Sequence, residues 1–127
     1  MLEKNVALYD RDENGELLPI EVTLEVDEED ESQQAYIGET IKIIPISRGK
    51  IKRLFATVNV NDKDADMDGQ IIEEHCFLPA YNKKEVEYMK PVLSAIIVNT
   101  IFRESGISPG KSKKKAVLKA EDDFAKN

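Results

Sequence analysis

TIKIIPISRGKIKRLF, residues 40–55, is the stretch that indicates how this chain is built. Isoleucines dominate its first half, as is typical of a β-strand, and Pro45 removes a hydrogen-bond donor where that strand should end. Ser47 follows, and its hydroxyl can cap a helix whose first turns are rich in lysine and arginine. The stretch therefore predicts a strand within residues 36–46 that leads directly into a short basic helix over about residues 48–56.

The first third of the chain predicts a β-hairpin. The dipeptide at residues 14–15, Asn-Gly, is a strong signal for a tight turn between strand candidates at Val6–Tyr9 and Leu17–Val26. In the second strand aliphatic side chains alternate with Glu and Thr, which places the aliphatic ones on a single face. The run DEEDESQQ at residues 27–34 contains nothing suited to burial, and it predicts a mobile loop.

The second half of the chain predicts helices. A brief helix over about residues 70–77 is expected to end before Pro79. Residues 82–85, Asn-Lys-Lys-Glu, form a candidate capping box at the start of the longest helix, which covers about residues 83–104. Pro91 lies inside this helix and should kink it or split it in two.

These elements predict an α+β fold in a single domain over residues 1–106. A small antiparallel sheet, built from strands within about residues 6–46, is expected to pack on the C-terminal helices. Gly106 is a suitable terminator for the last helix. Residues 107–127 are rich in lysine and poor in large apolar side chains, so they predict a disordered tail.

Charge is distributed unevenly along the chain. Residues 1–40 hold 13 acidic and 2 basic residues, a net charge of −11, whereas residues 41–127 hold 12 acidic and 16 basic residues, a net charge of +4. An acidic first third would repel a polyanion, so no nucleic acid partner is expected. The longest apolar stretch, Val92–Phe102, is too short to span a bilayer, so no membrane partner is expected either. Because the chain opens without a secretory leader and has one cysteine, we expect a cytoplasmic protein.

One acidic segment has the outline of a metal site. Residues 64–75, DADMDGQIIEEH, match a calcium-binding EF-hand loop at several positions, but the twelfth position is His75 and cannot supply two oxygen ligands. His75 and Cys76 are adjacent, and neighbours on a helix point about 100° apart, so we expect core residues and not a catalytic pair. The sequence thus predicts no metal, no cofactor and no enzymatic activity.

The longest predicted helix carries an apolar face. Its aliphatic residues recur at three- and four-residue spacing, as expected for an amphipathic helix. The candidate partner-binding residues on this face are Leu93, Ile96, Ile97, Ile101 and Phe102. The same face can instead form the protein's own core, and the sequence leaves both possibilities open.

Three short motifs occur in a characteristic order. Residues 40–49 follow the pattern T-I-x-I-x-P-[IL]-[ST]-R-G, residues 76–81 follow C-x-x-P-x-[FY], and residues 101–106 follow I-x-x-x-S-G. Together they resemble the tail assembly chaperones of long-tailed bacteriophages, in which the first motif joins a strand to a helix and the last ends a two-part helix. The resemblance covers roughly residues 36–106.

The resemblance implies a non-enzymatic role. Such chaperones coat the long helical tape measure protein, keep it soluble and help to bring tail tube subunits to it in the host cytoplasm. They are absent from the mature virion. The opposite net charges of the two parts of this chain would also allow its copies to associate with one another.

Two other functions fit parts of the sequence. A structural head–tail connector or tail tube-type subunit would suit the β-rich first third. A calcium-binding module would rest on the acidic loop at residues 64–75.

Overall fold

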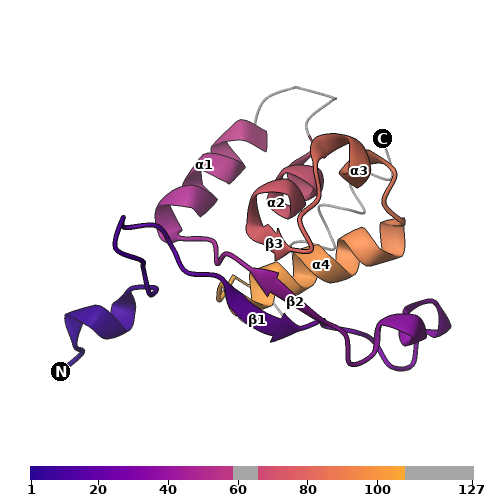
Figure 1. Ribbon diagram of the computed structural model, residues 1–127, viewed down its shortest axis with the longest axis horizontal. Helices are drawn as coiled ribbons and strands as arrows, with labels where there is room; N and C mark the ends of the chain where they lie inside the picture. Colours follow the sequence, from indigo (N-terminus) through magenta and orange to yellow (C-terminus); the bar gives the residue numbers. More distant parts are fainter. Residues whose placement is uncertain (59–65, 108–127) are drawn as a thin grey trace.

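A three-stranded antiparallel sheet and a group of helices make up the computed structural model, which describes residues 1–58 and 66–107. The strands are β1 (Ile20–Thr23), β2 (Thr40–Ile43) and β3 (Cys76–Leu78), in the order β1-β2-β3. The helices are η1 (Lys4–Ala7), η2 (Glu31–Tyr36), α1 (Arg48–Val58), α2 (Met67–His75), α3 (Lys83–Glu87) and α4 (Pro91–Glu104). In Figure 1, α4 runs beside the sheet, α2 and α3 lie above α4, and α1 projects from the end of the sheet. The predicted α+β fold class is confirmed.

The register of the sheet follows the alternation in the sequence. Val22 of β1 lies opposite Ile41 of β2, and both are buried, as is Ile43. Glu21 lies opposite Lys42 on the other face, which is exposed to solvent. The period of two therefore gives one apolar face that needs a cover and one polar face that does not.

Strand β3 corrects the helix predicted over residues 70–77. Helix α2 already ends at His75, and Cys76 and Phe77 belong to the sheet, where Cys76 lies opposite Ile43. The backbone N–H of Ile44 donates a hydrogen bond of 2.8 Å to the carbonyl of His75. This pairing joins segments about 30 residues apart, so no local sequence pattern could report it.

The N-terminal hairpin is reduced to a turn. The strand predicted at Val6–Tyr9 is wrong, because η1 covers Val6 and Ala7, and the two arms are linked only close to the turn, by a bridge between Arg11 and Leu17 and by backbone hydrogen bonds within residues 10–18. Gly15 has a φ of 80°, and the carboxylate of Asp12 accepts hydrogen bonds from the backbone N–H groups of residues 14 and 16. The turn forms locally, but the exposed side chains of residues 1–9 offer no buried face to hold a strand in place.

The acidic run at residues 27–34 also differs from its prediction. In place of a mobile loop it contributes to η2, whose N-terminal end is capped by Asp30. The Asp30 carboxylate accepts hydrogen bonds from the backbone N–H and the hydroxyl of Ser32, at 3.0 and 2.7 Å. Polar side chains can order a short exposed segment by bonding to the nearby backbone, without any apolar burial.

The helix ends follow the local signals of the sequence. The Ser47 hydroxyl accepts a hydrogen bond of 3.3 Å from the Lys50 N–H at the start of α1, and the capping box between Asn82 and Glu85 is complete. Pro91 is the first residue of α4, so the predicted long helix is split into α3 and α4. Of the predicted tail, residues 108–127 lie outside the described residues. Among the helices in the described ranges, none has both the length and the apolar content needed to cross a membrane.

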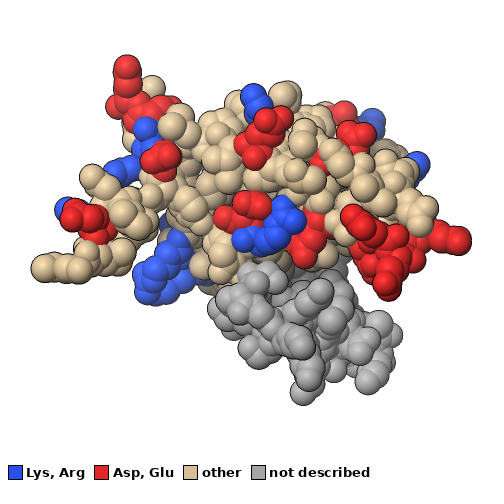
Figure 2. All heavy atoms as spheres, turned by 90° about the horizontal axis from the view of Figure 1, so that it is seen from below, with Lys and Arg blue, Asp and Glu red and all other residues tan. Residues whose placement is uncertain are grey.

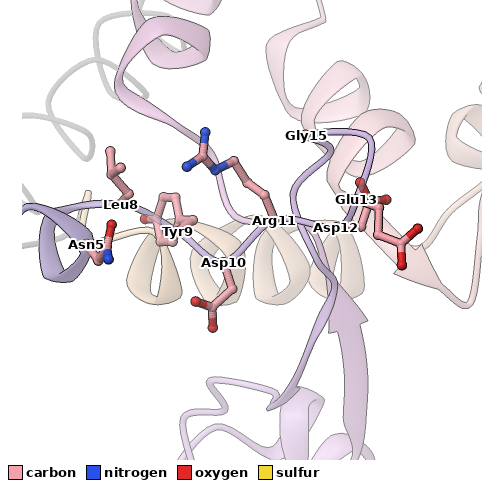
Figure 3. Close-up of a pocket in the computed structure, with 8 residues that line it drawn as sticks. All are labelled: Asn5, Leu8, Tyr9, Asp10, Arg11, Asp12, Glu13 and Gly15. Carbon is pink, nitrogen blue, oxygen red and sulfur yellow. The ribbon is translucent and has the colours of Figure 1, made fainter.

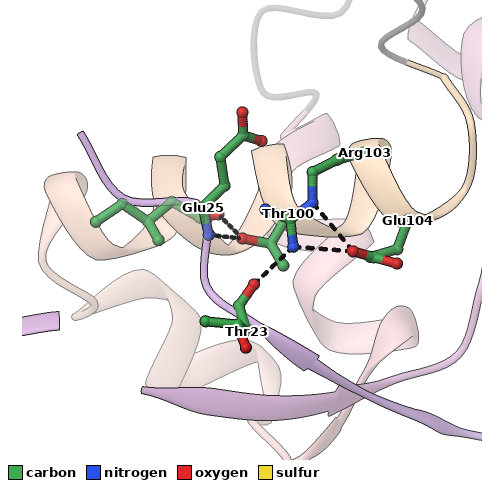
Figure 4. A network of polar contacts seen from close by, with 6 residues as sticks. Thr23, Glu25, Thr100, Arg103 and Glu104 are labelled. Carbon is green, nitrogen blue, oxygen red and sulfur yellow. Dashed lines mark hydrogen bonds and ion pairs between the residues drawn. The ribbon is translucent and has the colours of Figure 1, made fainter. Parts of the chain in front are cut away.

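One polar network joins the end of β1 to α4 (Figure 4). The buried hydroxyl of Thr100 donates to the Ile96 carbonyl at 2.7 Å and accepts from the Glu25 N–H at 2.9 Å. Arg103 donates to the Thr23 carbonyl at 2.6 Å and forms an ion pair with Glu104. These bonds hold the strand at a fixed position along the helix that covers it.

We expect the substitution Thr100→Val to destabilise the fold by about 1–3 kcal/mol, because the Glu25 N–H would lose its acceptor at a partly buried position. Urea unfolding followed by circular dichroism measures the change. Thr40→Val is the matched control, since Thr40 is an exposed strand residue, and it should have little effect. Equal effects of the two substitutions would contradict a structural role for the Thr100 hydroxyl.

Candidate partner-binding surface

The apolar face of α4 is part of the protein's own core. Ile96, Ile97, Ile101 and Phe102 are buried, with exposed fractions between 0 and 9%, and Leu93 is partly buried against the same cluster. They pack with the apolar face of the sheet and with α2. The expectation that these five residues form a partner-binding surface is therefore corrected. The apolar face of the sheet needs a cover, and α4 provides it.

His75 and Cys76 are structural residues at the junction between α2 and β3, as expected. Both are buried. The imidazole Nδ1 of His75 lies 2.9 Å from the Ile44 carbonyl oxygen, and the Cys76 thiol donates to the Pro79 carbonyl at 3.2 Å. Each side chain is thus engaged with a different backbone carbonyl, which is not the arrangement of a nucleophile and its base.

Burial sets the ionisation of this pair. A carbonyl oxygen only accepts, so Nδ1 of His75 carries the hydrogen, and the buried Nε2 has no partner among the described residues. Burial lowers the pKa of His75 because protonation would place a charge inside the fold, and the nearby Lys50 adds to this effect, while the Ile44 carbonyl and Glu74 oppose it. Burial also raises the pKa of the Cys76 thiol to about 11, so the thiol stays protonated at neutral pH.

The acidic segment at residues 64–75 divides into two parts. Asp64, its first residue, lies outside the described residues. Asp66 caps α2, and its carboxylate accepts a hydrogen bond of 2.9 Å from the Gly69 N–H. A Cβ atom at Gly69 would clash with that carboxylate, so the cap itself accounts for the glycine. In the described ranges, no group of three or more His, Cys, Asp or Glu residues could hold a metal ion.

The three motifs that resemble tail assembly chaperones meet at one place in the structure. The first motif contains β2 and the start of α1, and its Ile43 lies opposite Cys76, the first residue of the second motif. Ser105 of the third motif accepts a hydrogen bond of 2.9 Å from the backbone N–H of Ile46. The junction between β2 and α1 is thus bonded to both of the other motifs.

A groove of about 440 Å³ opens beside this junction. One wall is the N-terminal segment of residues 6–9, and the other is formed by residues 46–51 and the end of α4. The groove is lined largely by apolar side chains, among them Val6, Leu8, Tyr9, Ile46, Ile51 and Ile107. The Tyr9 hydroxyl donates to the Ser105 carbonyl at 3.1 Å and holds the N-terminal wall in place. Burial raises the pKa of that hydroxyl, which keeps it a donor at neutral pH.

A second, more polar depression of about 430 Å³ continues along the same N-terminal segment (Figure 3). Leu8 and Tyr9 line both cavities, so the two are adjacent. Figure 3 shows Arg11 pointing to the same side of the segment as Leu8, whereas the carboxylate of Asp10 points to the opposite side. The apolar groove therefore borders on a polar, mainly acidic turn.

Helix α1 extends the groove with an exposed stripe. Arg48, Ile51, Lys52 and Phe55 are spaced as i, i+3, i+4 and i+7, which places them along one side of the helix. Arg48, Lys52 and Phe55 are exposed and Ile51 is partly buried, whereas Leu54 faces the core. We refer to these four residues as the α1 stripe. Sequence reasoning missed it, although the spacing was available as a signal in the basic helix.

Lowering the pH from about 7.5 to about 5.5 should lower the free energy of unfolding, because the pKa of His75 in the folded protein lies below its ordinary value of 6.5. The unfolded chain then binds the proton first, so stability present above about pH 6.5 is lost as the pH falls towards the folded pKa. Urea unfolding at several pH values measures this slope.

His75 is the only histidine in the chain, which makes the test specific. The variant His75→Gln keeps a side-chain N–H for the Ile44 carbonyl but has no titrating group, so its stability should change much less over this pH range. Equal slopes in the two proteins would show that a different group causes the pH dependence.

Comparison of the chain with protein-family models, with curated proteins and with solved structures finds no match. No relative therefore assigns a role to the groove or to the α1 stripe. The features from which a function can be argued are the junction of the three motifs, the groove beside it and the distribution of charge.

Proposed function

We propose that this protein is a tail assembly chaperone of a long-tailed bacteriophage. It acts by binding and not by catalysis. Its main partner is the long helical tape measure protein, which it keeps soluble, and it assists the recruitment of tail tube subunits. It works in the host cell cytoplasm and is not a component of the mature virion.

The meeting of the three motifs is the observation that carries the proposal. If the motifs belong to one pattern, their members are expected to contact one another in the folded chain. Here Ile46 bonds to Ser105, and Ile43 pairs with Cys76. A pattern whose members hold one junction together is what a shared fold would produce, and this supports the resemblance from which the function is inferred.

The surface of the protein is compatible with this role. An apolar stripe on a long helix aggregates unless it is covered, and reversible coverage requires many small contacts. The groove and the α1 stripe offer an apolar area of limited size. Figure 2 shows acidic side chains gathered at the end of the molecule that carries η2, and Asp27, Glu28, Glu29 and Glu31 are exposed there. Such charges would keep coated rods apart through repulsion.

Co-expression with the tape measure protein of the same phage tests the proposal. That protein should be insoluble when expressed alone and soluble with this chain, because its apolar stripe is then covered. Affinity purification followed by mass measurement should find many copies of this chain for each tape measure chain. The control is an unrelated acidic protein of similar size, which should leave the tape measure protein insoluble.

Two outcomes would contradict the proposed chaperone function. One is a purified complex that contains no long helical protein. The other is a closed ring of this chain with a fixed copy number, which would identify a head–tail connector or tail tube-type subunit.

Charge reversal at the acidic end separates binding from solubility. We expect the triple variant Glu28→Lys, Glu29→Lys, Glu31→Lys to bind the tape measure protein but to give a complex that precipitates, because repulsion between coated rods is lost. Sedimentation of the co-purified complex measures this. The neutral variant with Gln at the same positions should be intermediate, and a fully soluble reversed complex would contradict the expectation.

A further inference from the structure

The α1 stripe combines apolar and cationic side chains. Phe55 is 52% exposed, and Ile51 lies one turn earlier on the same side, where it also lines the groove. Arg48 and Lys52 flank these two residues along the helix. Phe55 alone would be an ordinary exposed apolar residue, but here it continues the apolar lining of the groove through Ile51.

The positive charge of α1 contrasts with the rest of the chain. Residues 48–58 hold four basic residues and no acidic one, in a protein with a net charge of −7. Lys50 is engaged within the fold through an ion pair of 2.7 Å with Glu74 of α2. Arg48 and Lys52 point to solvent and have no ion-pair partner among the described residues. Two cations thus remain available beside an open apolar groove.

We propose that the groove and the α1 stripe together bind an amphipathic helix of a partner protein. The apolar side chains of the partner helix fill the groove and cover Phe55. Its acidic side chains, which border that apolar stripe, lie against Arg48 and Lys52. This inference rests on the proposed function for the helical nature of the partner, and it replaces the α4 face as the binding surface.

The geometry accommodates a helix. The stripe from Arg48 to Phe55 is about 10 Å long at 1.5 Å per residue, and the groove extends it past the start of α1. Two or three turns of a partner helix can lie along this length and present side chains at i, i+3, i+4 and i+7. Carboxylates on the partner helix give it a preferred orientation. They are attracted to Arg48 and Lys52 and repelled by the acidic turn at residues 10–16.

Model peptides test the inference with the full chain. One peptide of about 20 residues has a leucine stripe bordered by glutamates, a second has lysines in place of the glutamates, and a third has the acidic sequence scrambled so that no stripe forms. Titration calorimetry at low and high salt measures their affinities. The acidic amphipathic peptide should bind at least about tenfold more tightly than the other two, and high salt should lower its affinity.

Paired variants locate the binding surface. The double variant Arg48→Glu, Lys52→Glu should lower the affinity for the acidic peptide by at least about tenfold and raise the affinity for the basic peptide. Lys83→Glu with Lys84→Glu is the matched control, because it makes the same charge change at the start of α3, and it should leave the preference between the peptides unchanged. Phe55→Asp should also reduce binding, whereas Phe77→Asp on β3, which is 49% exposed, should not. Thermal melting establishes that each variant is folded.

The outcomes separate this inference from the proposed function. The proposed binding surface would be contradicted if the acidic peptide did not bind, or if it bound no better than the basic or the scrambled peptide. Equal effects of the two charge reversals would contradict it as well. If the tape measure protein co-purifies undiminished with the variant Arg48→Glu, Lys52→Glu, the function stands and the surface is wrong. If the peptides bind as expected but no tape measure protein co-purifies, the surface stands and the chaperone function falls.

Discussion

The cover that α4 gives to the apolar face of the sheet is the interaction on which the rest of the structure depends. The sheet has three short strands, and a sheet of this size is not stable in water without a packed face. Ile43 of the central strand and Ile97 and Ile101 of α4 are almost fully inaccessible to solvent, so strand and helix exclude water from each other. This packing removes the α4 face from any role in binding a partner.

Hydrogen bonds then fix where along α4 the sheet lies. The Thr100 hydroxyl bonds to the backbone just after β1, and the Ser105 hydroxyl bonds to the backbone just after β2. Apolar contacts alone would tolerate a shift of the helix, because they have little directional preference. The buried His75 adds a third directional contact at the strand–helix junction. Two of these contacts involve the first motif, through Ile44 and Ile46, whereas the Thr100 contact lies outside the three motifs.

With α4 buried, the candidate surface for a partner comprises the N-terminal segment, the groove and the α1 stripe. They lie at the junction of the motifs, while most of the exposed acidic residues of the first third lie at the η2 end or in the turn at residues 10–16. A partner helix would be attracted to one region and repelled from the others. Such separation of charge gives orientation at a small interface, where the buried area alone provides little specificity.

Features that a residue imposes on its own backbone could be predicted from the sequence. Pro91 begins a helix because it has no N–H to donate, Asn82 and Glu85 cap one reciprocally, and the alternation around Val22 gives β1 its two faces. Only the tertiary structure decided features that need a distant partner. Residues 76–78 became a strand because they pair with β2, whereas Val6–Tyr9 did not, because its exposed side chains gave a strand no buried face to hold it. For the same reason the sequence did not reveal the α1 stripe, since an apolar residue on α4 or α1 becomes part of the core or stays exposed according to what packs against it.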